Sequence, residues 1–398
     1  MKKAEIVIIG GGVVGASVAF HLTGRGVRDV LILESEARQG LGSTGAATGG
    51  VRAQFETDIN IKMSLYSIDF LRNWDQDCEY DPKGYLFFAT TDEQFAYLKG
   101  NVDKQRTLGV EGVEIVDPKV ISEMVPGMIC SDIVGGSYGP HDGFVNPLAI
   151  MRAFTEGAIR GGARIEFRNE VTGLRVDDGR IRGVETLGGI IGCDAVVLCT
   201  GARAAELART ADVELPVTPQ RRQIVWARTK DPLPADLPMV IDIGSGFHFR
   251  PARDFSQSLT GSASAISNDA GTYVLFAYPD PDEPSSLRTD FEDAFIEKVY
   301  SRARLRAEFL HRSEVVRNRC RAGLYENTPD HHAILGGCEI DGLYFANGFS
   351  GHGVMHSPAT GRALSEIILD GRATFLDVSS LSIGRFANGK LLHETAFI

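Results

Sequence analysis

The chain has no long apolar run and no excess of positive charge. No stretch approaches the roughly 18 consecutive apolar residues that a membrane-spanning helix needs. The 41 basic and 52 acidic side chains give a net charge of −11, and a chain of this sign repels the phosphate backbone of nucleic acids. Acidic residues interrupt the arginine-rich stretch 302–321, so a solvated helix face or ion pairs explain it better than a nucleic-acid patch. We therefore expect neither a transmembrane segment nor a nucleic-acid partner.

Cysteines are few and scattered. The six cysteines form no Cys-x-x-Cys pair, so their spacing predicts neither a zinc site nor a disulfide framework, and free thiols in a reducing compartment are expected. Lys2 and Lys3, followed by an apolar run to Phe20, resemble the start of a signal peptide, but four glycines interrupt that run. We expect a cytoplasmic protein without a bound metal.

Glycine is the residue in excess. It supplies 45 of the 398 residues, about 11% against a usual value of roughly 7%, and this excess indicates tight turns and close approaches of the backbone. Apolar residues at 43% and charged residues at 23% are typical of a globular protein. The length predicts two domains.

A complete β-α-β unit is predicted near the N-terminus. Residues 5–9 and 30–33 are short apolar runs that favour buried parallel strands, and residues 13–23 place small and apolar side chains at helical spacing. Further helices are expected over 58–78, 92–108, 148–160 and 291–303, with short strands and turns between them.

The turn between the first strand and helix carries a nucleotide-binding pattern. Gly10-Gly11-Gly12-Val13-Val14-Gly15 fits Gly-x-Gly-x-x-Gly, and Glu34 lies 19 residues beyond Gly15 at the end of the second strand. In such a motif the first glycine makes the tight turn, the second lets a pyrophosphate approach, and the third lets helix and strand pack closely. The helix N-terminus attracts phosphate. Glu34 can accept hydrogen bonds from ribose hydroxyls, which disfavours NADP. The pattern predicts a dinucleotide site.

The spacing of this motif does not separate NAD from FAD. The glycine-rich segment 42–52 follows the ribose-binding strand, and its small hydroxylated residues can line a second, longer pyrophosphate and ribityl path. A flexible surface loop is the alternative interpretation of this segment.

Several separated stretches together resemble the FAD-dependent D-amino-acid oxidase superfamily. They are the glycine motif with Glu34, the loop 42–52, Asp142-Gly143 before Pro147, and the segments 196–201, 322–330 and 348–353. Within that superfamily the chain is most similar to the branch of sarcosine oxidase, glycine oxidase and the L-proline dehydrogenase β-subunit. The resemblance implies an α/β fold in which a Rossmann-like FAD-binding domain is interleaved with a β-rich, mixed-sheet α+β substrate domain.

The resemblance also implies domain boundaries and cofactor contacts. We expect the FAD-binding domain over 1–80, 145–215 and 320–398, and the substrate domain over 81–144 and 216–319. By position in the family's motifs, the residues expected to bind FAD are Gly10, Gly12, Val13, Val14, Gly15, Glu34, Ser43, Thr44, Ala47, Val171, Gly201, Gly323, Gly348, Ser350, Gly351, His352, Gly353 and Met355. Ser357-Pro358 predicts the N-cap and first residue of a helix to about Leu369, whose positive end faces the flavin.

The reaction implied by the resemblance is oxidation of the C–N bond of a small amino acid to an imine, by hydride transfer to flavin N5. A secondary or N-methyl amine such as sarcosine or L-proline is the expected substrate. The expected catalytic-site residues are Arg52, His248, Tyr325 and His352. Arg222 and Arg250 are further candidates for binding the substrate carboxylate, since arginine binds carboxylates through two parallel hydrogen bonds.

Three positions depart from the family's pattern. Some members attach FAD through a cysteine at the position of Gly323, but the nearest cysteine here is Cys320, and an offset of three places it on the opposite face of a strand. Non-covalent FAD is therefore expected. Met355 stands where some members have a carboxylate-binding lysine, and Leu275 aligns roughly with a lysine that activates oxygen. A dehydrogenase is thus an alternative to an oxidase.

Other interpretations stay open. Glycine or a D-amino acid is an alternative substrate, and the electron acceptor is oxygen or another redox carrier. The chain can also be the catalytic subunit of a multisubunit amino-acid dehydrogenase, within a homo- or hetero-oligomer. Two alternatives come from different classes: an NAD-dependent dehydrogenase, and a flavin-binding subunit that no amine reduces.

Overall fold

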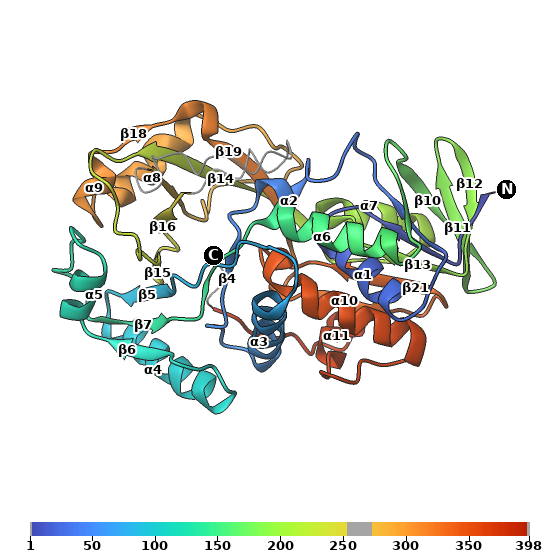
Figure 1. The fold of residues 1–398 in the computed structure, drawn as a ribbon, viewed down its shortest axis with the longest axis horizontal. Coiled ribbons are helices and arrows are strands. Elements are labelled where there is room, and N and C mark those ends of the chain that lie inside the picture. The colour runs from blue at the N-terminus through green and yellow to red at the C-terminus, as the bar shows by residue number, and fades with distance from the viewer. Residues whose placement is uncertain (1, 253–272, 396–398) are drawn as a thin grey trace.

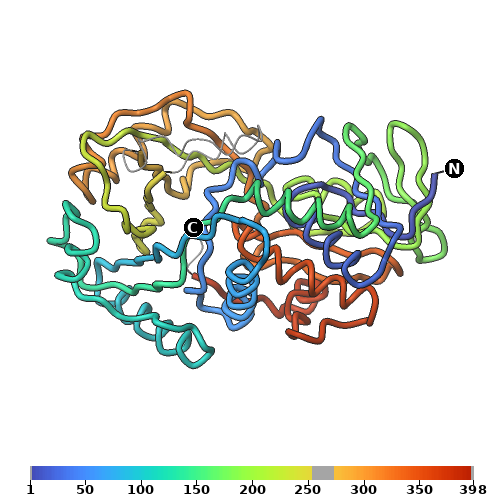
Figure 2. Tube along the Cα trace, viewed as in Figure 1, coloured from blue at the N-terminus to red at the C-terminus, as the bar shows by residue number. Residues whose placement is uncertain are grey.

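Two large β-sheets lie side by side along the long axis of the molecule in the computed structural model, which describes residues 2–252 and 273–395 (Figure 1). The short helix α2 (Ser43–Ala46) and strand β19 (Arg321–Asn327) lie where the two halves meet. The first described residues lie at the far end of one half, whereas the last described residues lie near the junction (Figure 2). Segments distant in sequence therefore come together at the centre.

A mainly parallel sheet forms the core of the first half. Its described strands, in order across the sheet, are β20 (Ile334–Gly337), β21 (Leu343–Asn347), β13 (Ala195–Leu198), β2 (Ile6–Ile9), β3 (Val30–Leu33) and β9 (Arg164–Glu166). Every residue of β2 and β3 is buried, because both faces of the sheet are covered. Ile6 and Ile8 pack on one face, and Val7 and Ile9 on the other.

Helices cover one face of this sheet and a smaller sheet covers the other. The helices are α1 (Val13–Gly24), α3 (Asp58–Asn73), α6 (Pro147–Arg160) and α10 (Gly353–Asp370). The smaller sheet contains β1 (Lys2–Lys3), β12 (Gly189–Gly192), β11 (Arg180–Thr186) and β10 (Val171–Asp177), next to helix α7 (Ala204–Ala208). The α/β fold with a Rossmann-like half is thereby confirmed.

Nine described strands form the mixed sheet of the second half. Eight of them lie in the order β18 (Glu314–Val315), β14 (Thr218–Arg228), β17 (Tyr273–Ala277), β16 (His248–Pro251), β15 (Met239–Asp242), β5 (Tyr85–Ala89), β7 (Gly135–Gly139) and β6 (Glu114–Val116), and β19 pairs with β14. Among these pairs only β15–β5 is parallel. In β5, Leu86 and Phe88 point into one core, and Tyr85 and Phe87 into another, as the two-residue period of a strand requires.

The remaining described elements surround these sheets. They are helices α4 (Asp92–Thr107), α5 (Pro118–Met124), α8 (Ala294–Ala303), α9 (Glu308–His311) and α11 (Gly384–Ala387), the paired strands β4 (Gly50–Val51) and β8 (Gly143–Phe144), and the 3-10 turns η1 (Gly201–Arg203), η2 (Arg209–Ala211), η4 (Arg317–Arg319) and η5 (Ser379–Leu381). In the part of the chain that the structure describes, no helix is long and apolar enough to cross a membrane. That part also holds no cluster of potential metal ligands.

The start of helix α10 differs from the prediction, which placed its first turn at Ser357-Pro358. The helix starts at Gly353, and Pro358 lies inside it. Proline has no N–H for the carbonyl of Val354, but the Ser357 hydroxyl donates to that oxygen at 2.9 Å, and the next amide, of Ala359, donates to Ser67 Oγ at 3.3 Å. Because these hydroxyls replace the missing backbone bonds, the proline does not mark a helix start.

One further helix boundary differs from its prediction, and one strand bears on a predicted domain limit. Helix α3 ends at Asn73 rather than near 78, since Trp74 is extended and packs its ring 4.7 Å from that of Phe154. Strand β19, placed with the FAD-binding part by the boundary at 320, pairs along its length with β14 of the second sheet. The predicted domain limits, including the one at 320, remain predictions.

Gly15 tests the close contact between β2 and α1. A methyl group here would lie 2.0 Å from the carbonyl oxygen of Gly10, so we expect Gly15→Ala to destabilise the fold by about 1–3 kcal/mol through overpacking. Gly24→Ala, at the open end of the same helix, is the matched control, because nothing lies within 4 Å of the added methyl group. Thermal unfolding measures both variants, and equal midpoints would contradict the expectation.

Candidate cofactor and substrate site

A cavity of about 670 Å³ runs between the two halves of the molecule. On one side it is lined by the glycine turn after β2, the end of β3, and η1. On the other it is lined by strands β14, β15, β16 and β19. Residues of helix α2 and the first residues of α10 also line it. Such a cavity is of the size that encloses a small ligand or cofactor.

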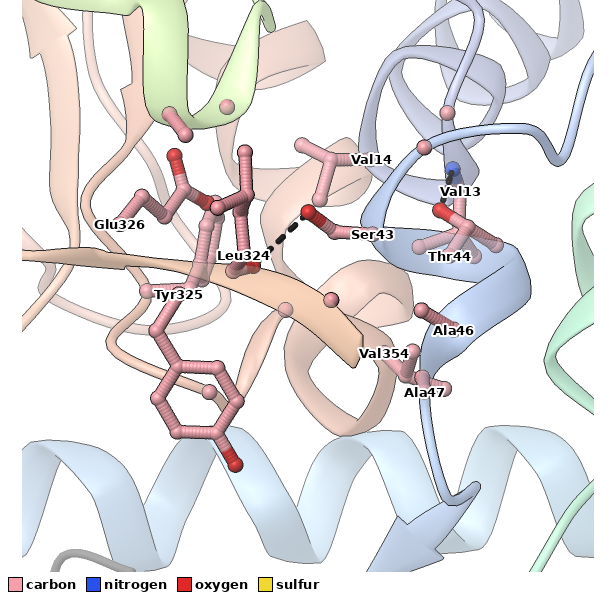
Figure 3. A pocket seen from close by; sticks show the side chains of 18 of the residues that line it. Val13, Val14, Ser43, Thr44, Ala46, Ala47, Leu324, Tyr325, Glu326 and Val354 are labelled. Carbon is pink, nitrogen blue, oxygen red and sulfur yellow. Dashed lines mark hydrogen bonds between the residues drawn. The ribbon is translucent and has the colours of Figure 1, made fainter. Parts of the chain in front are cut away.

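The glycine turn forms a cradle at one end of the cavity. Gly10 has φ +104°, and a methyl group on it would lie 2.3 Å from the carbonyl oxygen of Cys199, so only glycine fits there. Gly12 caps α1 without a side-chain hydrogen bond, while the N–H of Val13 donates to Thr44 Oγ1 at 3.1 Å (Figure 3). The positive end of α1 therefore faces the cavity, as a phosphate group requires.

Glu34 is held rigidly beside this cradle. One carboxylate oxygen accepts the N–H of Gly11 at 2.9 Å, and the other accepts the N–H of Glu36 at 2.9 Å. A carboxylate oxygen has two lone pairs, so Glu34 retains acceptor capacity toward the cavity that it lines. This arrangement fits a ribose whose hydroxyls are unphosphorylated.

Helix α2 connects the cradle to the second half. Ser43 Oγ donates to the carbonyl oxygen of Leu324 at 2.8 Å (Figure 3), and Arg321 donates to the carbonyl oxygens of Ala46 and Ala47 at 3.2 and 3.1 Å. Strand β19 approaches so closely that a methyl group on Gly323 would lie 2.6 Å from Ala46 Cβ. Side-chain-to-backbone hydrogen bonds and the close approach at Gly323 thus hold the wall between the two sheets in place.

Cys320 does not take part in this wall. Its sulfur accepts the N–H of Trp226 at 3.5 Å, and the residue is packed in the core of the second sheet and does not line the cavity. Cys199 does line the cavity, but burial raises the pKa of its thiol, which makes the thiolate scarce. These placements agree with a cofactor that is bound without a cysteine link.

Arg52 lies buried where the two halves meet, 3% exposed. Its Nη1 donates to the carbonyl oxygen of Gln54 at 2.7 Å, and its Nη2 lies 3.4 Å from His352 Nε2. The guanidinium carbon lies 4.0 Å from the centre of the Phe55 ring. Since an arginine can only donate, His352 Nε2 is the acceptor in this pair, and the histidine is neutral.

Two carboxylates brace the loop that carries Arg52. Asp142 accepts the N–H of Ala53 at 2.6 Å and the side-chain amide of Gln54 at 2.9 Å. Glu394 accepts the backbone N–H of Glu56 at 3.0 Å, just before α3 begins. The position of Arg52 is therefore set by residues distant in sequence.

His248 is a neutral acceptor on the substrate side. Burial lowers its pKa to about 4, with Arg222 as an additional repelling cation. Its Nδ1 lies 2.9 Å from the carbonyl oxygen of Gly246, so Nδ1 carries the proton and Nε2 is left as the acceptor. His248 lines the cavity.

Arg222 presents unpaired donors in the cavity. Its Nε and Nη1 are buried, and no described residue accepts a hydrogen bond from them. Its guanidinium lies 5.2 Å from the centre of the Tyr325 ring, and it sits opposite Gly323 in the β14–β19 pairing. Its neighbour Arg221 points to the other face and is paired with Glu283 at 2.9 Å. Because successive side chains of a strand point to opposite faces, Arg221 has a structural role and Arg222 is available to a ligand.

Most of the predicted site residues line the cavity. They are Gly10, Gly12, Val13, Val14, Glu34, Ser43, Thr44, Ala47, Arg52, Val171, Gly201, His248, Gly323, Tyr325, Gly351, His352, Gly353 and Met355. Gly15, Gly348 and Ser350 do not. Gly15 packs under Gly10, and Gly348 and Ser350 have φ of +75° and +51°, which bend the loop before α10. That loop delivers the N-terminus of α10 to the cavity at Gly353.

Arg250 was a candidate ligand for the carboxylate, and the structure gives it another role. It is buried but does not line the cavity, and it donates to the carbonyl oxygens of Pro251 and Thr48. It therefore braces the loop after α2. Tyr85 and Glu326 line the cavity although the sequence motifs did not single them out. Glu326 directly follows Tyr325 within the stretch 322–330 that resembles the family. This position was the sequence feature from which a role at the site could have been predicted.

Comparison with known proteins agrees with this geometry. The model of the FAD dependent oxidoreductase family, DAO, matches residues 5–367. The chain belongs to this family. It is an FAD-dependent enzyme whose relatives act on amine donors, and an NAD-dependent dehydrogenase is not supported. The cradle of α1, Glu34 and the α2 wall are the residues that fit FAD.

Individual relatives cover nearly the whole chain. FAD-dependent oxidoreductase domain-containing protein 1 of Xenopus laevis is 30% identical over 99% of this chain and 84% of its own length. Mitochondrial dimethylglycine dehydrogenase of Rattus norvegicus is 27% identical over 96% of this chain, which spans 45% of that protein. L-proline dehydrogenase from P. horikoshii has a similar structure, with a TM-score of 0.86, 29% identity, and coverage of 98% of this chain and 100% of that one.

Asp142→Ala tests the brace on Arg52. Loss of the carboxylate leaves the N–H of Ala53 without its acceptor and the side-chain amide of Gln54 with only the carbonyl oxygen of Tyr85, which we expect to cost about 1–3 kcal/mol of stability. We also expect acetate, a small carboxylate, to bind about tenfold more weakly, equivalent to about 1.4 kcal/mol. Thermal unfolding and the acetate-induced change in the flavin spectrum measure the two effects.

The exposed Asp103→Ala on α4 is the control for this variant. FAD content is expected to be unchanged in both variants, because Asp142 lies outside the nucleotide cradle. Unchanged acetate affinity in Asp142→Ala would show that the brace does not position Arg52.

Proposed function

We propose that the protein oxidises the C–N bond of a small secondary or N-methyl amino acid, such as sarcosine or L-proline, to an imine. The observation that carries this proposal is Arg222, whose Nε and Nη1 are buried in the cavity wall with no acceptor among the described residues. A buried, unpaired guanidinium is costly, and a substrate carboxylate supplies the partner that it lacks.

The residues of the substrate side bind and orient such a molecule. Arg222 holds the carboxylate, and Arg52 provides a second cation at the same cavity. The Nε2 of neutral His248 accepts a hydrogen bond from the substrate nitrogen, which favours the amine with one proton fewer. Bound FAD supplies the acceptor for the hydride that leaves the carbon next to this nitrogen. Alignment by fixed groups contributes more to this step than a strong base does.

Apolar and aromatic side chains complete the lining of the substrate side. Met239 and Ile241 line the cavity, and Tyr85 and Tyr325 lie with them. Burial raises the pKa of both tyrosines, so they stay neutral hydrogen-bond donors at physiological pH. This lining suits a small aliphatic substituent on the amino acid.

A second candidate keeps the chemistry and changes the substrate to glycine or a D-amino acid. The similarity to glycine oxidase from Geobacillus kaustophilus, with a TM-score of 0.81 and 25% identity, favours it. The acceptor of the electrons is a separate proposal. Leu275 is fully buried in β17 and does not line the cavity, so the oxygen-activating lysine has no counterpart at this position, and we favour a dehydrogenase.

Anaerobic reduction of the bound flavin tests the substrate. We expect sarcosine or L-proline to bleach the visible flavin band, whereas glycine and D-alanine leave it largely intact. If only glycine or D-alanine bleaches the band, the substrate is glycine or a D-amino acid instead of a secondary or N-methyl amino acid. A flavin band that none of the four reduces would contradict the proposed function. Slow return of the band in air, with fast return on adding a soluble quinone, would support a dehydrogenase.

Arg222→Ala tests the carboxylate site. Loss of a charged hydrogen-bonding pair costs about 2–3 kcal/mol, so we expect the KM of the bleaching amino acid to rise about 30- to 150-fold. Arg203→Ala removes an exposed arginine from the other end of the same cavity and serves as the control. Steady-state kinetics with an artificial acceptor measures both. An unchanged KM in Arg222→Ala would place the carboxylate elsewhere.

A further inference from the structure

Glu326 is a buried acid on the nucleotide side of the cavity that the amine chemistry does not use. It lies on β19 directly after Tyr325, and the two side chains leave opposite sides of the strand (Figure 3). Tyr325 is directed to the substrate side, near Arg222. Glu326 lines the cavity, and its Oε2 lies 3.9 Å from the point where a Cβ of Gly201 would be.

The carboxyl group of Glu326 is incompletely paired. Its Oε2 is buried, and no described residue hydrogen-bonds to it. The buried side chain of neighbouring Asn347 lies close to the same carboxyl group. An acid in such a place lacks a ligand for at least one oxygen, and the cavity is the direction from which a ligand arrives.

Burial favours the protonated form of Glu326. Burial raises its pKa to about 7, although the backbone of Gly348 and Phe349 and the side chain of Asn347 partly oppose this. Cys199, which directly follows β13, is close enough to Glu326 to interact with it electrostatically, and burial keeps its thiol neutral. On the neighbouring elements η1 and α7, Arg203 and Glu206 line the cavity but are exposed. Within the described residues, no lysine or arginine is paired with Glu326.

The cofactor makes the ionised form still less favourable. The pyrophosphate of FAD carries negative charge, and the cradle that attracts it lines the same cavity. An ionised carboxylate would repel this ligand, whereas a carboxylic acid has one O–H to donate. We propose that Glu326 binds FAD through its protonated carboxyl group, so that the affinity for FAD depends on the proton held by this side chain.

The direction of the pH dependence follows from this proton. Below pH 7 the acid is protonated before FAD arrives, and binding requires no proton uptake. Above about pH 7, only a minority of the FAD-free molecules have a protonated Glu326. Because FAD binds only these molecules, its affinity falls as the pH rises. If only the protonated form binds, the dissociation constant rises about 30-fold between pH 6 and pH 8.5.

Titration of the FAD-free protein with FAD tests the proposal. Quenching of flavin fluorescence gives the dissociation constant at pH 6, 7, 8 and 8.5, with no catalytic turnover involved. In Glu326→Gln the side-chain amide keeps a donor but cannot ionise, so we expect tight binding that varies less than about threefold over this range.

Glu206→Gln is the matched control, because it makes the same change at an exposed acid of the same cavity. It should keep the pH dependence of the wild type. A flat wild-type profile, or a Glu326→Gln profile as steep as that of the wild type, would overturn the proposal. Matching thermal unfolding midpoints of the FAD-free proteins verify that the variants fold. This test is independent of which amine the protein oxidises.

Discussion

The contact between strand β19 and helix α2 determines how the two halves of the molecule face each other. Three hydrogen bonds from Ser43 and Arg321 join backbone to side chain across this contact, and Gly323 permits the close approach. The strand is paired with β14 along its whole length, so it belongs to the second sheet while forming a wall of the nucleotide site. A shift of one residue in this pairing would exchange the faces of Tyr325 and Glu326.

This arrangement also places different charged groups on the nucleotide side and on the substrate side of the site. On the nucleotide side the positive end of α1 and the fixed carboxylate of Glu34 match a phosphate and a ribose. On the substrate side the cations Arg52 and Arg222 face neutral histidines. The two sides are divided by one strand whose alternate side chains point in opposite directions. A single element can therefore serve two ligands of different chemistry.

The nucleotide half is predictable from sequence because its determinants are local. Strand, glycine turn, helix and Glu34 follow one another within a β-α-β unit, so periodicity and spacing suffice. The start of α10 is not predictable in the same way. Ser357-Pro358 has the pattern of a helix N-terminus, yet hydroxyls from α3 and α10 itself satisfy the broken backbone pairing. Distant side chains decide that boundary.

The substrate side depends on contacts between segments far apart in sequence. Arg221 and Arg222 are adjacent, and the pairing of β14 with β19 decides which of them meets Glu283 and which enters the cavity. Arg250 is of the residue type expected to bind a carboxylate. However, its guanidinium donates hydrogen bonds to the carbonyl oxygens of Pro251 and Thr48. Residue type limits which side chains can bind the carboxylate. The pairing of strands distant in sequence then decides which of these arginines reaches the cavity.

Glu394 has a consequence for the order in which the protein matures. It braces the backbone at Glu56, 338 positions earlier in the chain. During synthesis the glycine cradle leaves the ribosome early, yet the loop that carries Arg52 cannot reach its final position until residue 394 has emerged. Contacts of such high sequence separation form slowly. The loop beside the substrate residues is therefore completed only when residue 394 has joined the fold.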